Sequence, residues 1–212
     1  MIRVVVADDQ ALMRTALEHF VAQAEDLEVV GSAEDGVQAL EAARTLAPDV
    51  VLMDMQMPRM DGVEATARIS AEAPGVRVLA ITTFSSEQYL VPALRAGAAG
   101  YLVKDAPPAE VVDAIRRVHA GDAVFSARVA ADLVEAVTAA PEHADPCPAE
   151  PLAPHERLTE RELDVVRELA KGASNAEIAG ALFLAEATVK SHIGKVLDLS
   201  LIHISEPTRP ER

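Results

Sequence analysis

Short valine-rich runs in the first 120 residues end in polar side chains that can do chemistry. These side chains are Asp8 and Asp9 after the first run, Asp54 after the third, Thr82 after the fourth and Lys104 after the fifth. If the runs are parallel strands, their carboxyl ends lie along one edge of a sheet, where ligands bind. Three carboxylates at one edge repel each other unless a cation shares the site, and oxygen ligands favour Mg²⁺. A carboxylate beside Mg²⁺, with a lysine and a hydroxyl nearby, suits the acceptance of a phosphoryl group.

Each of these residues also has an ordinary alternative role. The Asp8-Asp9 pair could cap the following helix, Thr82 could be a loop hydroxyl, and Lys104 could be a surface lysine. Coincidence is a poor explanation for all of them, because every one falls at the end of an expected strand.

The elements that must position these residues alternate between strands and helices. Strands are expected at residues 2–7, 27–33, 50–54, 76–82 and 100–104. Helical periodicity follows each run, and several of the helices end at proline or glycine. This alternation predicts an α/β fold, a doubly wound five-stranded parallel sheet with helices on both faces.

A second, all-α domain is expected after a linker. Residues 140–156 contain five prolines and no apolar period, which is typical of a semi-rigid linker. Two capping boxes follow, Thr159 with Glu162 and Ser174 with Glu177. Three short helices, expected at 158–172, 174–183 and 185–198 and joined by tight turns, predict a helix-turn-helix unit. We therefore expect a domain at 1–121, a helix and linker at 122–155, an incomplete helical domain at 156–198, and a tail at 199–212.

Composition narrows the class of protein. The 212 residues are half apolar and include a single cysteine, so an internal disulfide is excluded. No apolar run approaches the roughly 18 residues of a membrane span, and the first apolar run is too short for a signal peptide. The net charge is −15, but it is −8 over residues 1–120, −5 over 121–155 and only −2 over 156–212. Any DNA contact must therefore come from a local surface of the last third.

The motifs that carry this pattern resemble a known family. "VVVADDQ", "VVLMDMQMPRMDG", "AITTF" and "GYLVKD" resemble bacterial response-regulator receiver domains, and the segment from "LTERELDVV" to "TVKSHIGKVL" resembles the LuxR-type helix-turn-helix. Together they resemble the NarL/FixJ family of two-component transcription regulators over about residues 1–197. The resemblance implies a phosphoprotein of the cytoplasm, not an enzyme beyond self-phosphorylation and self-dephosphorylation. It implies as partners a sensor histidine kinase, promoter DNA, a second copy on phosphorylation, and RNA polymerase.

The resemblance also assigns roles in the first domain. Asp54 would be the phosphoacceptor, and Asp8, Asp9, Asp54 and the main-chain carbonyl of Gln56 would hold Mg²⁺. Thr82, Tyr101 and Lys104 would sense the phosphoryl group, with Tyr101 turning inward as Thr82 moves. The alternative for Tyr101 is a half-buried strand aromatic.

In the last helix the resemblance places DNA contacts at Thr188, Lys190, Ser191, His192 and Lys195. The residues alone agree only in part, because they offer two lysines and a histidine on a helix without acids between Glu186 and Asp198. An exposed helix face with two lysines is the ordinary alternative.

Three other functions compete with this interpretation. A haloacid dehalogenase-type phosphatase needs a second aspartate two positions after the nucleophile, where this chain has Gln56. A nucleotide binder needs a glycine-rich loop after the first strand, and "ADDQALMR" has none. The third alternative is a phosphorylation-dependent adaptor that acts through protein contacts without binding DNA.

The tail departs from the family pattern. Relatives continue past "GKVL" with a fourth helix, whereas "LSLIHISEPTR" from Leu199 resembles the translation of a sequencing-library adapter. A natural frayed terminus is the alternative. The expected consequence of a missing helix is an exposed apolar stripe on the first helix of the domain, at Leu163, Val166 and Leu169.

Overall fold

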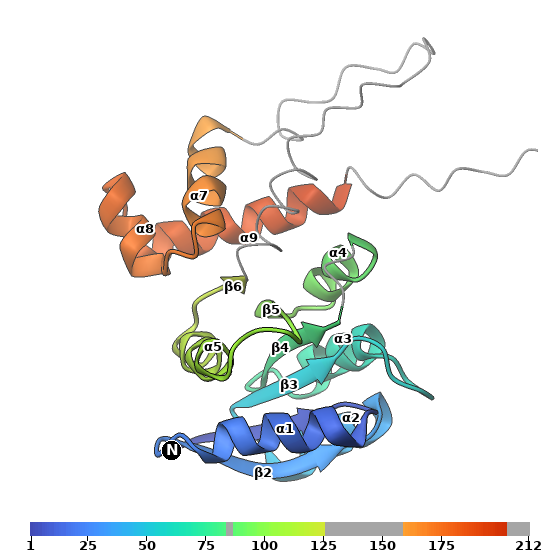
Figure 1. Ribbon diagram of the computed structural model, residues 1–212. Coiled ribbons are helices and arrows are strands. Elements are labelled where there is room, and N and C mark those ends of the chain that lie inside the picture. Colours follow the sequence, from blue (N-terminus) through green and yellow to red (C-terminus); the bar gives the residue numbers. More distant parts are fainter. Residues whose placement is uncertain (84–86, 126–158, 203–212) are drawn as a thin grey trace, which may run out of the picture.

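The computed structural model describes residues 1–83, 87–125 and 159–202 (Figure 1). A parallel sheet with the strand order β2-β1-β3-β4-β5-β6 occupies the first 125 residues. Its strands are β1 (Ile2–Ala7), β2 (Leu27–Ala33), β3 (Val50–Asp54), β4 (Arg77–Thr82), β5 (Gly100–Val103) and β6 (Val124–Phe125). The predicted α/β class and all five predicted strands are confirmed. The two-residue strand β6, which pairs with β5, was not predicted and extends the sheet beyond residue 121.

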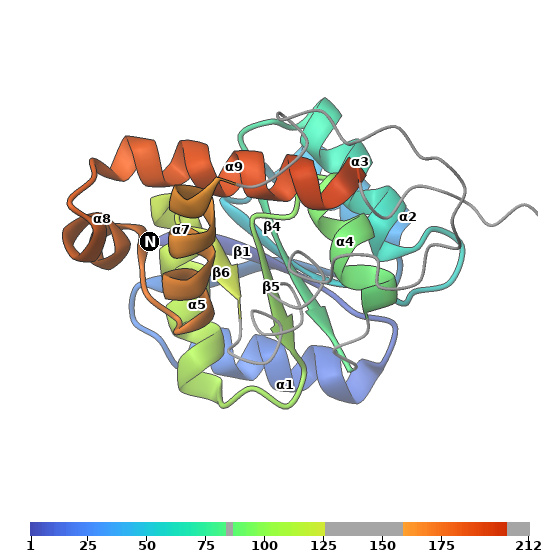
Figure 2. The same ribbon diagram turned by 90° about the horizontal axis from the view of Figure 1, so that it is seen from above.

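Helices cover both faces of this sheet, as Figure 2 shows from above. The helices are α1 (Ala11–Ala22), α2 (Gly36–Leu46), α3 (Gly62–Glu72), α4 (Glu87–Arg95) and α5 (Pro108–Ala120). Val4 and Val6 point to the face covered by α1 and α5, whereas Val5 points to the opposite face with α2 to α4. Successive strand residues alternate between faces, so each buried strand contributes to two apolar cores.

The second domain consists of α7 (Glu160–Ala170), α8 (Asn175–Leu182) and α9 (Glu186–Ile202). Both predicted capping boxes are present, since Thr159 and Ser174 each exchange hydrogen bonds with the glutamate three residues later. These boxes satisfy backbone N–H groups that a helix start leaves without partners. Val165, Ile178 and Val189 are fully buried between the three helices.

Two expectations about the end of this domain are wrong. Helix α9 continues to Ile202 and does not stop at Asp198. Val166 and Leu169 are buried, and Leu163 is half-buried, so the expected stripe is not exposed. Helical periodicity predicted that these side chains share a face but could not say what packs over it.

The two domains touch in this structure. Helix α9 lies against α4, and both views place these helices side by side (Figures 1 and 2). The Arg117 guanidinium at the end of α5 donates to the carbonyl oxygens of Gly172 and Ala173, each at 3.3 Å. The linker and the helix expected at 126–140 lie outside the described residues, as does the tail after residue 202. Within the described ranges no helix is long and apolar enough to cross a bilayer.

Candidate functional site

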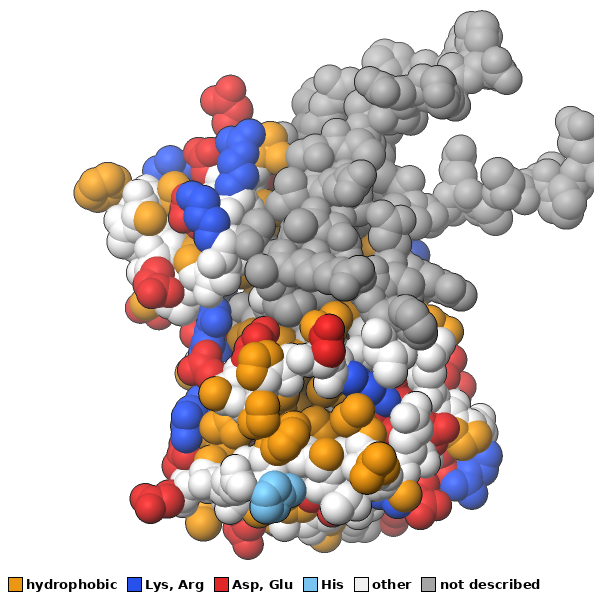
Figure 3. Space-filling model, in the orientation of Figure 1, with side chains coloured by type: hydrophobic (Ala, Val, Ile, Leu, Met, Phe, Trp, Pro, Cys, Tyr) orange, Lys and Arg blue, Asp and Glu red, His pale blue; other side chains and the backbone are white. Residues whose placement is uncertain are grey.

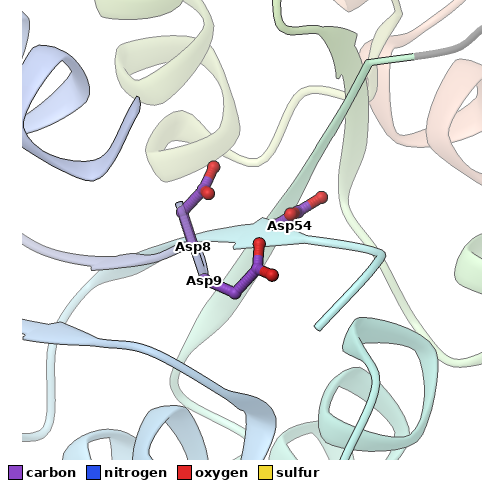
Figure 4. A group of neighbouring side chains, drawn as sticks. All are labelled: Asp8, Asp9 and Asp54. Atoms are coloured by element: carbon purple, nitrogen blue, oxygen red, sulfur yellow. The ribbon is translucent and has the colours of Figure 1, made fainter. Parts of the chain in front are cut away.

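The three predicted carboxylates converge where the strand order reverses. Strands β1 and β3 are direct neighbours, so the residues that follow β1 lie beside the end of β3. Figure 4 shows Asp8, Asp9 and Asp54 grouped at these strand ends. Each offers a carboxylate oxygen within 4.8 Å of the others. The edge of the sheet therefore carries a compact acidic site at its topological switch point.

Lys104 lies inside this acidic site. Its Nζ is 2.7 Å from Asp8 Oδ2 and 2.8 Å from Asp54 Oδ2, and its side chain is only 3% exposed. Strand β5 delivers the lysine, and the Lys104 N–H donates to the Thr82 carbonyl at the end of β4. One ammonium thus neutralises part of the charge of three carboxylates.

Backbone N–H groups hold the remaining oxygens of the two buried aspartates. The Gln10 N–H donates to Asp8 Oδ1 at 2.9 Å, and the Gln56 N–H donates to Asp54 Oδ1 at 3.2 Å. Asp54 is 2% exposed, whereas Asp9 is open to solvent. The carboxylates of Asp8 and Asp54 are therefore fixed in orientation, and the carboxylate of Asp9 faces solvent.

Burial and pairing set the protonation behaviour of the site. Burial raises the pKa of Asp54, although the hydrogen bond from Lys104 acts in the opposite direction. Burial disfavours the charged form of Lys104, but its hydrogen bonds to Asp54 and Asp8 outweigh burial and raise its pKa. We expect Lys104 to stay an ammonium ion at neutral pH, because its charge is needed to offset the carboxylates.

Thr82 and Tyr101 both lie inside the protein. Thr82 is buried at the end of β4, and Tyr101 of β5 is fully buried. Burial raises the pKa of the Tyr101 phenol to about 12, with the Thr82 side chain acting against this. The structure therefore excludes a half-buried strand aromatic, because Tyr101 already occupies an inward position.

The donor set fits a hard divalent cation. Three carboxylates meet within 4.8 Å and only one ammonium lies among them, so negative charge remains for a cation to neutralise. Oxygen ligands of this kind, with one carboxylate open to solvent, suit Mg²⁺, which retains several water ligands. Asp8, Asp9 and Asp54 are the side chains that could hold it.

The structure adds a contact of Gln56 that the sequence did not indicate. Its side-chain amide donates to the Tyr89 hydroxyl of α4 at 2.9 Å. Only its main-chain carbonyl had been considered as a ligand. The side chain instead links the loop after Asp54 to the helix that contacts α9.

The predicted DNA-contact residues lie along α9. Thr188, Lys190, Ser191 and Lys195 are exposed, and His192 is half-buried. Figure 3 shows lysine and arginine side chains on the helical domain interspersed with acids. Lys190 reaches the first domain, since its Nζ stands 3.2 Å from the position that a Cβ on Gly121 would take. In this arrangement part of the α9 surface faces the first domain.

A buried acid beneath α9 was recognised only as a helix cap. Glu162 Oε2 accepts from the Thr159 N–H and hydroxyl, while Oε1 lies 3.9 Å from His192 Nδ1 and 3.8 Å from Lys195 Nζ. Burial disfavours its charged form, but the Thr159 hydrogen bonds and the two cations outweigh burial and lower its pKa. Glu162 therefore both caps α7 and faces His192 and Lys195, two of the predicted DNA contacts.

An acidic site with a lysine at the switch point of a parallel sheet, joined to a helix-turn-helix domain, defines a two-component response regulator. Comparison with known families supports both halves. Residues 4–116 match the response regulator receiver domain, and residues 156–198 match the LuxR family of bacterial regulatory proteins.

Relatives share the same architecture. The uncharacterized transcriptional regulatory protein YxjL of Bacillus subtilis is 41% identical over 196 residues, which cover 92% of this chain and 88% of the relative. LiaR of B. subtilis is 37% identical over 209 residues, 99% of this chain and 94% of LiaR. The crystal structure of ChrA, a response regulator of a heme-sensing two-component system, is 35% identical, with a TM-score of 0.55 over 91% of this chain and 86% of ChrA. The chain belongs to the LuxR/NarL family of response regulators, which are transcriptional regulators with a DNA-binding domain and not conventional enzymes.

Proposed function

We propose that Asp54 is the phosphoacceptor of this response regulator. The observation that carries the proposal is the burial of Asp54 at the end of β3, beside two more carboxylates and 2.8 Å from Lys104 Nζ. Asp8 is held in the same way, by Lys104 and the Gln10 N–H, so what singles out Asp54 is its place in "VVLMDMQMPRMDG", the segment that resembles the phosphoacceptor motif of receiver domains. Asp8 and Asp9 are then left to hold a metal with it.

The proposed transfer is a displacement at phosphorus. An oxygen of Asp54 forms a bond to the phosphorus of a phosphohistidine on a sensor histidine kinase. The bond from phosphorus to the imidazole nitrogen breaks, and its electron pair stays with the leaving imidazole. Mg²⁺, held by Asp8, Asp9, Asp54 and the Gln56 carbonyl, supplies positive charge to the phosphoryl oxygens when bound.

Thr82, Tyr101 and Lys104 form the proposed response to phosphorylation. The Thr82 hydroxyl donates to a phosphoryl oxygen, and Lys104 exchanges its bond to Asp54 for the new charge. The added negative charge shifts the equilibrium between two arrangements of the segment that carries these residues. Because Tyr101 is already buried, the proposed rearrangement involves Thr82 and Lys104 and needs no inward turn of Tyr101.

Asp54→Asn tests the phosphoacceptor. We expect this variant to lose all acid-labile phosphorylation by acetyl phosphate with Mg²⁺, measured by intact mass and by labelling. Asp61→Asn is the matched control, because Asp61 lies in the same loop but caps α3 through the Glu64 N–H, a bond that asparagine can also accept. Stoichiometric labelling of Asp54→Asn, with the control unchanged, would show that another residue accepts the phosphoryl group.

We propose further that α9 reads promoter DNA through Thr188, Lys190, Ser191, His192 and Lys195. Four of these five side chains are exposed on one helix after a tight turn, which supports this because such a helix enters the major groove, although Lys190 also reaches Gly121 of the first domain. Symmetric operators require a dimer, so phosphorylation is proposed to pair two copies in the cytoplasm and to present them to RNA polymerase. The proposed domains are 1–121, with β6 extending the first domain to Phe125, then the linker up to residue 155, and 156–198.

The segment 199–212 is proposed to be foreign to the family, so that its fourth helix is missing here. Support comes from the LuxR-family match, which ends at residue 198, where the resemblance to the adapter sequence begins. The alignment with LiaR covers 209 residues, 99% of this chain, and so includes part of this segment, which counts against the proposal. Sequencing residues 195–212 from an independent clone decides the point: the same codons would refute the proposal, and a different Leu- and Val-rich continuation would support it.

A further inference from the structure

The three carboxylates of the acidic site repel each other, so the loops that carry them must be held together. Asp8, Asp9 and Asp54 are carried by two separate strand ends, yet their oxygens lie within 4.8 Å of each other. Like charges at this spacing push their loops apart, and Lys104 offsets only part of that repulsion. Other contacts must hold the loops together.

Arg14 supplies the first of these contacts. It lies in α1, and its Nη1 donates to the main-chain oxygen of Asp8 at 2.7 Å. Its Nη2 pairs with Glu34 Oε1 in the β2–α2 loop at 3.3 Å. The Arg14 side chain is only 16% exposed, whereas Glu34 is 61% exposed, so the bond to the Asp8 main chain is the more shielded of the two contacts. Arg14 therefore ties the loop that carries Asp8 and Asp9 to the β2–α2 loop.

Arg59 supplies the second contact from the opposite side. Asp35, the neighbour of Glu34, is fully buried, caps α2 through the Gln38 N–H at 2.8 Å, and forms an ion pair with Arg59 through Oδ2. Arg59 belongs to the loop after Asp54 and adopts a left-handed φ of 66°, which is uncommon for a residue with a side chain.

A backbone hydrogen bond accompanies this ion pair. The Gly36 N–H donates to the Met60 carbonyl at 3.0 Å. A Cβ on Gly36 would stand 2.6 Å from that oxygen, so only glycine allows the approach. The β2–α2 loop is thus joined to both loops that carry the acidic site, although it offers no ligand of its own.

We propose that Arg14 and Arg59 are positioning residues for the metal site, acting through Glu34 and Asp35 as one brace across the three loops. This rests on the proposed Mg²⁺ site. The brace holds the carboxylates at the spacing that the cation requires, so that binding does not have to bring the loops together. Loss of a group that hydrogen-bonds to a metal ligand, as Arg14 does through the Asp8 main chain, typically lowers metal affinity by about 10- to 100-fold, and we expect an effect near the lower end for this brace.

The molecule contains a matched control for this idea. Arg116 of α5 forms a bidentate ion pair with Asp26, with distances of 2.8 and 2.6 Å. Asp26 directly precedes β2, so this pair lies at the amino ends of the strands, opposite the acidic site. This ion pair also joins a helix to a loop, but it lies away from the carboxylates. Arg116→Gln should therefore leave Mg²⁺ affinity unchanged.

The experiment measures Mg²⁺ binding by isothermal titration calorimetry on the full-length chain at fixed ionic strength. We expect Arg14→Gln and Arg59→Gln each to raise the Kd by about tenfold relative to Arg116→Gln. Arg14→Gln/Arg59→Gln should raise the Kd by less than the product of the two single effects, because both contacts act through the β2–α2 loop. Arg14→Lys and Arg59→Lys should recover part of the loss, since lysine keeps the charge.

Removal of Arg59 leaves the Asp35 carboxylate buried without its cation, which could unfold the protein. Asp35→Asn/Arg59→Gln removes both charges and keeps a cap for α2, so it tests the brace in a folded chain; urea unfolding in EDTA verifies the fold. Kd values within twofold of Arg116→Gln for Arg14→Gln and this double variant would overturn the brace. Absence of Mg²⁺ binding by the wild-type chain would instead overturn the metal site itself.

Discussion

The receiver domain and the helical domain place their functional side chains in opposite environments. In the receiver domain Asp54 and Lys104 are almost fully buried and hold each other in one geometry. In the helical domain the proposed contacts lie on one helix, and Lys195 is 67% exposed. A buried charge depends on its partners, whereas an exposed one is screened by water and salt. Single substitutions should therefore act strongly in the receiver domain and in small increments in the helical domain.

The electrostatic balance differs in the same way. The first 120 residues carry a net charge of −8, and the functional acids are concentrated at one sheet edge. The last 57 residues carry −2, and their cations alternate with acids (Figure 3). The acidic edge of the receiver domain therefore attracts a cation. The helical domain is close to neutral, so it neither repels nor attracts DNA strongly.

Removal of one lysine from each domain should show the largest difference. Lys104→Met leaves Asp8 and Asp54 buried without their cation, so we expect the free energy of unfolding in EDTA at pH 7 to fall by about 3 kcal/mol. Lys195→Met removes an exposed lysine that lies 3.8 Å from the buried Glu162, which keeps its hydrogen bonds from Thr159, so this change should cost less than about 1 kcal/mol. Urea unfolding followed by circular dichroism measures both. Equal losses would contradict the contrast between the two environments.

DNA binding should respond by a smaller and salt-dependent amount. In Lys190→Ala/Lys195→Ala we expect affinity for a mixed-sequence duplex to fall at least about tenfold, and the slope of log affinity against log salt to fall by about 2. Fluorescence anisotropy at several salt concentrations measures this. Lys171→Ala is the control, because Lys171 is an exposed lysine paired with Glu168 after α7. Unchanged binding by the double variant would mean that α9 does not contact the duplex.

The smallest effect is expected from the replacement of Glu162, a buried acid beneath α9. Its pKa is lowered from 4.5 in the folded chain, so its stabilising contribution is present above pH 4.5 and is lost as the pH falls through the lower folded value. Glu162→Gln should therefore lower the free energy of opening of α7 by about 1 kcal/mol at pH 7. The loss should become progressively smaller as the pH falls below 4.5. Amide hydrogen exchange in α7, corrected for the intrinsic pH dependence, measures this. A difference that stays constant between pH 7 and pH 3 would exclude a role for the Glu162 charge.

Much of the fold was predictable because its signals are local. Valine-rich runs predicted the five long strands, and the Thr159 and Ser174 boxes predicted two helix starts. Strand β6 was missed because two residues carry no periodic signal, and its stability comes from pairing with β5. The predicted end of the last helix at Asp198 is too early, because the apolar period breaks there but the helix continues to Ile202.

The site was predictable in its ligands but not in its supports. Asp8, Asp54 and Lys104 could be named because each falls at the end of a strand. Arg14 and Arg59 could not, because their ion-pair partners lie 20 or more residues away along the chain and no spacing rule connects them. The contact of Gln56 with Tyr89 was missed for the same reason.

The sequence by itself determined the elements, the helix caps, the candidate ligands and the family, since these depend on residue types at short spacing. Only the tertiary structure decided which distant groups meet. Strand order brings Lys104 between Asp8 and Asp54, packing carries Tyr101 inside, and two arginines join three loops around the acidic site. The physical reason is that hydrogen bonds and ion pairs act over a few ångströms in space, whatever the distance along the chain.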